Sequence, residues 1–406
     1  MLRDIVFEGM AAPLRLDRAA SVLSLLPYVI VGWPFQVRPA EMTASPFFSI
    51  SETSDDGLFR CEWHVEERPV RAFDPVNAVC DAISALSFAL PAEDDRLICL
   101  HAAAVEIAGR LVVFPNIRRA GKSTLSAALA MAGNALFSDD VLPLSFTADD
   151  RALGRAMGIA PRLRLPLPDA VPREFKDWVA TASGPQNRQY LYLSLANQPG
   201  HGVIRTVGAF VILDRQDEVI DARLEQVPPD VAMDVLLHQN FTRDRHSGDI
   251  LQAMAGALAK LPVFRLTYSG LAEAVACLNA GFANWPDDRP AQTDGAERRF
   301  RLAQFDGPSL PTPGKEEPIR QRAGTIAERI GDTLYLADAE GLAIHRMDAL
   351  ATVIWSVLEE PVTAQDIVDL LNEAFPEADA GKVAADVQSL LTTLHGARMI
   401  ETSVGG

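Results

Sequence analysis

A chain of 406 residues is longer than one hydrophobic core usually serves, so two or three domains are expected. Its apolar content of 48 % and mean hydropathy of +0.07 are typical of a globular protein and exclude a disordered one. The formal net charge of −17 argues against nucleic acid as the partner, because phosphates repel an acidic surface.

The sequence contains little evidence for export or for insertion into a membrane. The longest apolar stretches, such as residues 21–35, are too short or too interrupted to span a bilayer, and the N-terminus lacks a signal-peptide core. The four cysteines show no CxxC spacing and are too few for a disulfide scaffold. We therefore expect a cytoplasmic protein with free thiols and no membrane partner.

Residues 1–95 show two local patterns. Polar and apolar residues alternate over 48–65 around an Asp-Gly turn, which predicts a hairpin. Residues 75–90 have helical spacing after a proline. We expect a region containing a small sheet, which supports the domain that follows.

Strands and helices alternate over residues 96–285, which predicts an α/β layer domain. "RLICLHAAAVEIAGRLVVFP" (96–115) reads as two strands joined at 108–110, and residues 135–146 as an apolar strand with two carboxylates. Further strands are expected at 190–196 and 208–214, and helices at 122–133, 228–240, 248–260 and 270–281.

The pattern changes after residue 285. Proline, glycine and charge without periodicity over 286–317 indicate a linker. Residues 318–402 then read as a separate βββααα domain. Its strands are expected at 325–330, 333–340 and 342–347, and its helices at 348–359, 363–375 and 380–395.

The stretch "FPNIRRAGKST" (114–124) lies between an apolar strand and a helix, as a phosphate-binding loop does. Such a loop presents main-chain N–H groups to phosphates at a helix N-terminus, so asparagine at the position of the usual first glycine is tolerable. The expected nucleotide-binding residues are Asn116, Ile117, Arg118, Arg119, Ala120, Gly121, Lys122, Ser123 and Thr124. The alternative is a chance G-K-S-T ahead of an ordinary helix.

A second motif argues against the interpretation of the G-K-S-T sequence as a chance occurrence. "ALFSDD" places Asp139 and Asp140 after an apolar strand, where a phosphotransferase has a carboxylate that binds Mg²⁺ or accepts a proton. The alternative is an ordinary turn at a strand end, where aspartate is common.

His101, the "GKST" loop and "SDD" follow one another as in the HPr kinase/phosphorylase family, which this region resembles over roughly residues 95–285. The intervals agree as well, with 22 residues from His101 to Ser123 and 16 from Ser123 to Asp139. The resemblance implies a P-loop fold of the phosphoenolpyruvate carboxykinase-like type and a kinase that uses ATP and Mg²⁺ on a protein serine.

By this resemblance, Lys122 and Ser123 would hold phosphate and Mg²⁺, and Asp139 would accept the hydroxyl proton with His101 beside it. Asp140 would support the metal or pair with an arginine. Taken alone, His101 would be read as a core histidine. Three departures are the absence of glycine at the loop start, Thr124 where the family has glutamate, and no clear substrate-gripping loop.

The arginine that would reach the transferred phosphate is assigned to Arg205, before the strand at 208–214. Arg243 and Arg245 are weaker candidates, for which a solvated loop is the favoured interpretation.

The C-terminal domain resembles the PqqD family in "YLAD", "IHRMDALATVIWSVLE", "VTAQDIVDLL" and "VAADVQSLLTTLHGARMI". The resemblance implies a winged-helix-like fold that binds the leader of a ribosomally made precursor peptide as a strand on its sheet edge. Plausible groove residues are Leu342, Ile344, Val383 and Leu390, any of which could instead be core. DNA binding is disfavoured, because residues 318–402 contain fourteen Asp/Glu against six Lys/Arg.

Together these patterns predict an ATP-dependent serine/threonine kinase acting on a precursor peptide that is recruited through its leader. The alternative is a catalytically weak nucleotide-binding scaffold that presents the peptide to another enzyme. A small-molecule kinase is a third reading, but it leaves the leader-binding domain without a purpose. Other peptide-maturation enzymes and a second copy of the chain stay open as partners.

Overall fold

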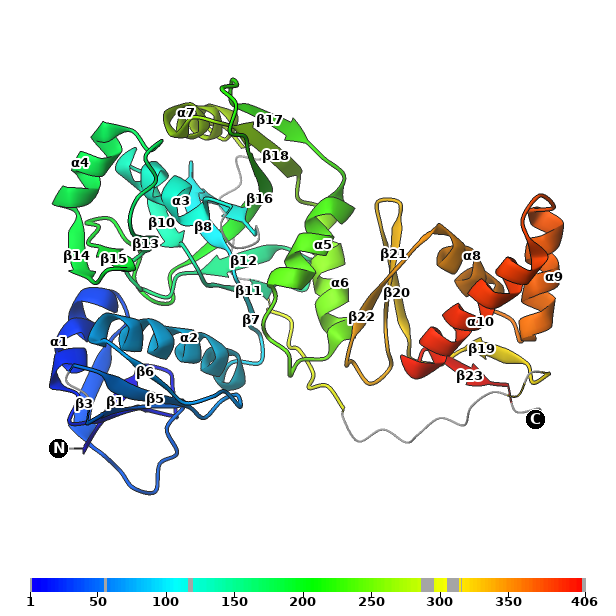
Figure 1. The fold of residues 1–406 in the computed structure, drawn as a ribbon, viewed down its shortest axis with the longest axis horizontal. Helices are drawn as coiled ribbons and strands as arrows, with labels where there is room; N and C mark the ends of the chain where they lie inside the picture. Colours follow the sequence, from blue (N-terminus) through cyan, green and yellow to red (C-terminus); the bar gives the residue numbers. More distant parts are fainter. Residues whose placement is uncertain are drawn as a thin grey trace. The chain divides into compact units, whose positions relative to one another are not determined.

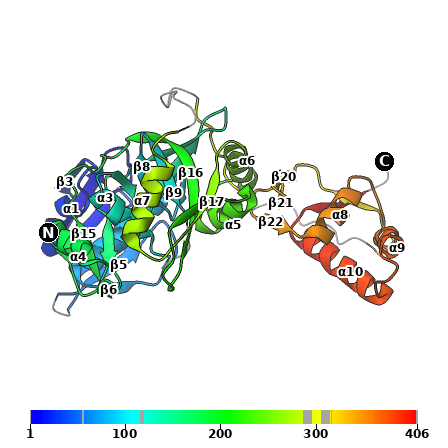
Figure 2. The same ribbon diagram turned by 90° about the horizontal axis from the view of Figure 1, so that it is seen from above.

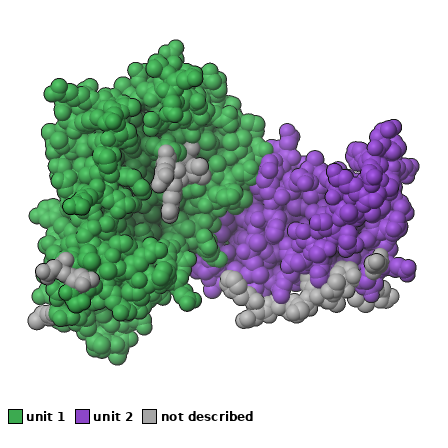
Figure 3. All heavy atoms as spheres, in the orientation of Figure 1, with its two compact units in different colours: residues 1–243, 260–299 green, residues 244–259, 300–406 purple. Residues whose placement is uncertain are grey.

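The computed structural model describes residues 2–54, 57–115, 120–285, 296–304, 314 and 316–403. The chain divides into two compact units, which are coloured separately in Figure 3. The first unit consists of Met1–Arg243 and Lys260–Arg299, and the second of Asp244–Ala259 and Phe300–Gly406. The linker expected at 286–317 lies largely outside the described residues.

The first unit begins with a six-stranded sheet in the order β3-β1-β2-β4-β5-β6 (Figure 1). Its strands are β1 (Leu2–Phe7), β2 (Leu14–Asp17), β3 (Phe35–Pro39), β4 (Phe48–Glu52), β5 (Phe59–Trp63) and β6 (Arg71–Phe73). Helices α1 (Ala20–Val29) and α2 (Pro75–Glu93) share one hydrophobic core with the sheet. The hairpin predicted over 48–65 is confirmed as the antiparallel pair β4–β5.

Helix α2 begins where the sequence favours a helix start. Asp74 caps it by accepting hydrogen bonds from the main-chain N–H groups of Val76 and Asn77, and Pro75 occupies the first turn. Among the described residues, α2 is the one helix long and apolar enough to span a bilayer, and 61 % of that window is buried inside the protein. Burial of this kind is found in core helices of globular proteins.

The centre of the first unit is a nine-stranded sheet with the order β10-β8-β9-β16-β12-β11-β7, in which β18 also pairs with β16 and β17 with β18. Its strands are β7 (Ile98–Leu100), β8 (Ala103–Ile107), β9 (Arg110–Phe114), β10 (Ala135–Ser138), β11 (Leu142–Phe146), β12 (Ala152–Arg155), β16 (Ile204–Arg215), β17 (Arg223–Gln226) and β18 (Val263–Tyr268). Strands β9, β16 and β18 run parallel. The stretch 96–115 therefore forms three strands rather than the two predicted.

Helices α3 (Lys122–Met131) and α7 (Leu271–Gly281) share a hydrophobic core with β8, β9, β16 and β18, and α7 lies in front of this sheet in Figure 2. A small sheet in the order β13-β15-β14 packs with α4 (Arg173–Thr181). Its strands are β13 (Arg162–Arg164), β14 (Ser183–Gln186) and β15 (Tyr190–Leu193). Helix α5 (Pro229–Gln239) leads to the point where the chain enters the second unit.

The second unit contains the predicted βββααα order. A sheet of β20 (Ile326–Ile330), β21 (Thr333–Ala337) and β22 (Ile344–Met347) precedes α8 (Ala349–Val357), α9 (Ala364–Ala374) and α10 (Ala380–Gly396). A capping box of Thr363 and Asp366 starts α9. A two-stranded sheet of β19 (Ile319–Gln321) and β23 (Ile400–Thr402), which was not predicted, joins the two ends of this domain.

Both faces of the sheet β20–β21–β22 are covered. Leu334, Leu336 and Met347 share a core with α8, α9 and α10. Helix α6 (Ser247–Leu258) lies on the opposite face. Its Gly248 packs closely against Ile326 of β20, since a Cβ atom added at this glycine would come within 2.4 Å of the Ile326 side chain. The sequence placed this helix in the central α/β domain, whereas it groups with the C-terminal unit.

Candidate functional site

Three segments distant in sequence meet at one end of the central sheet, and the strand registers explain why. Ala103, at the start of β8, pairs with Phe114, at the end of β9. Its neighbour Ala104 pairs with Ser138, at the end of β10. The two residues before β8, the loop after β9 and the residues after β10 therefore emerge together. These are His101, the expected phosphate loop, and Asp139 with Asp140.

The first element of the site is the N-terminus of α3. Gly121 precedes it with φ +87°, and a Cβ atom there would lie 3.2 Å from the Tyr268 hydroxyl, so this position requires glycine. The first turn contains no acidic residue, which leaves the positive end of the helix suited to an anion. Lys122 is buried at 6 % exposure, and its charge acts on Asp140. Asn116–Arg119 of the predicted loop lie outside the described residues.

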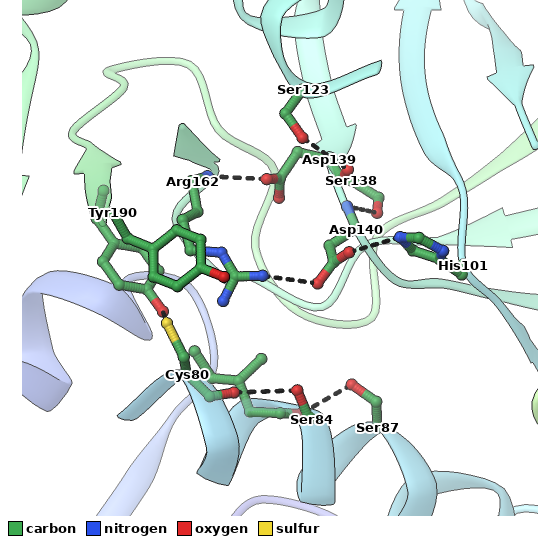
Figure 4. Close-up of polar contacts among 12 residues, drawn as sticks. Cys80, Ser84, Ser87, His101, Ser123, Ser138, Asp139, Asp140, Arg162 and Tyr190 are labelled. Carbon is green, nitrogen blue, oxygen red and sulfur yellow. Dashed lines mark hydrogen bonds and ion pairs between the residues drawn. The ribbon is translucent and has the colours of Figure 1, made fainter. Parts of the chain in front are cut away.

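The second element is His101, which is held from both sides. Its main-chain N–H donates to the carbonyl oxygen of Gln239, and its Nδ1 lies 2.9 Å from Gln239 Oε1. Its Nε2 lies 2.9 Å from Asp140 Oδ1 (Figure 4). The ring is therefore oriented by the end of α5 and directed at a carboxylate, so the interpretation of His101 as an ordinary core residue is disfavoured.

The third element is the pair of carboxylates, whose environments differ. Burial and the neighbouring Asp140 charge raise the pKa of Asp139 to about 7. Burial would raise the pKa of Asp140 as well, but the hydrogen bond with His101 and the Arg162 charge lower it. The hydroxyl of Ser123 lies 3.5 Å from the Asp139 carbonyl oxygen. At neutral pH, one carboxyl group is thus poised to take up a proton while the other stays ionised.

Arg162 belongs to this site by its contacts, although the sequence does not predict it. Its main-chain N–H donates to Asp139 Oδ2 at 2.8 Å, and its Nη2 donates to Asp140 Oδ2 at 3.1 Å. Figure 4 shows its guanidinium between Tyr190 and Asp140. The available signal was the alternation in "RLRL" (162–165), which places Arg162 and Arg164 on the face opposite to the buried Leu163.

Arg205 requires a correction, because the structure does not bring it to this site. Strands β16 and β9 run parallel with Val207 opposite Leu111, so Arg205 lies near the beginning of β9. The expected phosphate loop follows the end of β9, roughly 15 Å further along. Arg205 instead forms an ion pair with Glu106 at 3.0 Å. Of the weaker candidates, Arg245 is buried in the second unit.

The donor set at the site fits a magnesium ion bound together with phosphates. Within the described ranges, no group of three or more His, Cys, Asp or Glu side chains could hold a metal unaided. Mg²⁺ in phosphate sites needs only one or two carboxylates besides phosphate oxygens and water. The Ser123 hydroxyl near Asp139 and the ionised Asp140 offer such a set.

The sheet edge predicted to bind a peptide is β22, which pairs with β21 on one side. No described strand pairs with its other side. Leu342 is 40 % exposed just before this strand, while Val383 and Leu390 of α10 pack against the helical core. Ile344 lies opposite Ala337, on the α6 face, so the prediction that it lines a groove with α10 is wrong. His345, opposite Leu336, lies on the α10 face.

Comparison with known proteins adds three findings. The curated proteins give no match. Among solved structures, the chain is similar to the Hpr(Ser) kinase/phosphatase from Coxiella burnetii, with 14 % identity, a TM-score of 0.24, and coverage of 45 % of this chain and 95 % of that one. Residues 334–400 match the family model for coenzyme PQQ synthesis protein D (PqqD), so the C-terminal end of this chain is a PqqD domain.

Proposed function

We propose that this chain is an ATP-dependent kinase that phosphorylates a serine or threonine of a ribosomally made precursor peptide, which its PqqD domain captures by the leader. The observation that carries the proposal is the meeting of Lys122, Ser123, His101 and the two aspartates at one sheet end. The PqqD domain in the same chain supports a peptide as the acceptor.

The phosphate donor would bind at the start of α3. Main-chain N–H groups of the first turn and the Lys122 ammonium would hold the β- and γ-phosphates. Ser123 and Asp140 would hold Mg²⁺, which supplies neutralising charge for the phosphates. Gly121 permits close approach, because it presents no side chain toward Tyr268 or the ligand.

Asp139 would act as the proton acceptor. The acceptor hydroxyl oxygen forms a bond to the γ-phosphorus, its proton passes to the Asp139 carboxylate, and the bond from the γ-phosphorus to the β–γ bridging oxygen breaks, so that ADP leaves. With a pKa of about 7, Asp139 combines a substantial ionised fraction with enough basicity to accept the proton. His101 and Asp140 orient each other beside it.

The leader would add as a strand to the outer edge of β22. Main-chain groups of an edge strand pair with any extended segment, and side chains along the neighbouring helix select the sequence. Binding the leader in the same chain raises the local concentration of the acceptor segment at the kinase site.

Lys122→Ala tests the proposal directly. Purified full-length chain, ATP, Mg²⁺ and the cognate precursor are expected to give a phosphopeptide in mass spectra, and this variant should slow its formation about 10²- to 10³-fold, because a cation beside the transferred phosphate is lost. Lys176→Ala is the matched control, since that lysine bonds only a loop carbonyl on the surface in the described contacts.

The three candidate functions give different results in such assays. A precursor that stays unmodified while the wild-type chain binds ATP would reject the kinase and favour the presenting scaffold. Phosphate transfer to free serine or small alcohols without any leader dependence would favour a small-molecule kinase.

Gln239→Ala tests the orientation of His101. Loss of the amide leaves Nδ1 without its partner, so we expect the rate of phosphate transfer to fall about tenfold. Gln239→Glu keeps an oxygen acceptor and should retain more of the rate. Single-turnover rates at saturating ATP measure both variants, and equal losses in the two would contradict a role for this hydrogen bond.

A further inference from the structure

The Arg162 guanidinium interacts with groups from three different parts of the first unit. It donates to Asp140 at 3.1 Å and lies over the Tyr190 ring, with its central carbon 4.5 Å from the ring centroid. The Arg162 charge also acts on the Cys80 thiol of α2, which lies 3.0 Å from the Tyr192 hydroxyl. These interactions restrict the movement of the Arg162 side chain, which is only 22 % exposed.

The main chain of the same residue holds the other carboxylate. The Arg162 N–H donates to Asp139 Oδ2 at 2.8 Å, and Arg162 pairs with Tyr192 in the small sheet. Strand β13 is three residues long, so its own hydrogen bonds give it little rigidity. The guanidinium, fixed to Asp140 and Tyr190, therefore supports the backbone position from which Asp139 is held.

We propose that Arg162 is the positioning residue of the carboxylate pair, held in place by the Tyr190 ring of β15. This inference rests on the proposed kinase function. It gives the N-terminal region a task beyond general support, because Cys80 of α2, a helix in the core of the six-stranded sheet, hydrogen-bonds with Tyr192, the strand partner of Arg162.

A role in positioning differs from a role in binding ATP. Arg162 contacts Asp139 through its main chain and Asp140 and Tyr190 through its side chain. These contacts are already made in the free protein, so they do not depend on bound ATP. A variant should therefore lower kcat while the KM for ATP stays within about threefold, because the loss concerns the geometry of transfer.

The test uses full-length variants and two readouts. Arg162→Gln is expected to lower kcat about 10- to 100-fold. Arg162→Lys should recover part of the loss, since it keeps the charge without the planar donors. Tyr190→Leu should lower kcat about tenfold, and Tyr190→Phe should recover most of that, because only the ring face contacts the guanidinium. Arg164→Gln is the matched control, because Arg164 is exposed on the same strand and face and also lies over the Tyr190 ring, at 5.7 Å, but has no described contact with either aspartate.

The second readout is hydrogen exchange of the peptide that covers residues 138–141, and it does not depend on turnover. Arg162→Gln and Tyr190→Leu should speed exchange there, whereas Arg164→Gln should not. An increased KM for ATP with unchanged exchange, or no change in either readout, would overturn the proposal. If the wild-type chain transfers no phosphate, the kinase function fails, and the exchange measurement alone still decides the role of Arg162.

Discussion

Asp139→Asn is expected to lower phosphate transfer about 10²- to 10⁴-fold, because the amide cannot accept the hydroxyl proton. The substitution preserves the shape of the side chain, and the amide oxygen can still accept the N–H of Arg162. The phosphopeptide yield in single-turnover reactions measures the loss. ATP binding should persist, since Lys122 and the start of α3 are unchanged.

The same variant should be more stable than the wild type in alkaline solution. The pKa of Asp139 is raised from 3.8 to about 7 in the folded protein, so the stability it contributes is fully present below pH 4 and is lost as pH rises through 7. Ionising this buried group costs on the order of a few kcal/mol at pH 8.5, which asparagine avoids. Melting temperatures should therefore differ at pH 8.5 and agree more closely at pH 5.

Asp140→Asn is the matched comparison for this stability effect. Asp140 pairs with His101 and Arg162, and its pKa is lowered, so the group stabilises the folded state above pH 4 and loses that contribution only as the solution becomes more acidic. Its replacement should lower the melting temperature at neutral pH. A lowered melting temperature at pH 8.5 for Asp139→Asn would contradict the assignment of Asp139 as the strained proton acceptor.

The sequence predicted the residues of the site that lie at the ends of β8, β9 and β10, which pair antiparallel and are close in the chain. His101, Gly121–Ser123 and Asp139 flank three strands that follow one another closely, so local patterns were enough to bring them together. Arg162 comes from a strand of three residues, so the alternation in "RLRL" is a weak signal that does not connect this residue with the two aspartates.

Other differences come from tertiary contacts that a local pattern does not contain. The sequence favours Arg205 because it precedes an apolar strand, yet the parallel pairing with β9 places it at the end of that strand remote from the site. The amphipathic pattern of α6 would suit packing on the central sheet or on the C-terminal sheet. The sheet that it contacts, β20–β21–β22, starts almost seventy residues after the helix ends. Hydrophobicity alone makes Ile344 a plausible groove residue, whereas the register with β21 decides which face of the sheet it occupies.

Removal of the leader from the precursor is expected to lower kcat/KM about 10²- to 10⁴-fold, because the acceptor segment then binds without a tether. The rate at saturating concentrations of the leaderless peptide should recover, since the leader acts on local concentration and not on the chemical step. Kinetics with full-length and leaderless peptides measure both quantities. A leaderless peptide with unchanged kcat/KM would contradict recruitment through the PqqD domain.

The sheet edge itself is tested by Leu342→Asp, which places a charge beside the start of β22. Leader affinity should fall about ten- to a hundredfold, because an apolar contact is replaced by a charge that must lose water. Leu370→Asp on α9 is the matched control, since Leu370 is 45 % exposed against 40 % for Leu342. Titration of a fluorescent leader into each full-length variant gives the affinities. Equal losses in the two variants would place the leader elsewhere, because only Leu342 adjoins the unpaired side of the sheet.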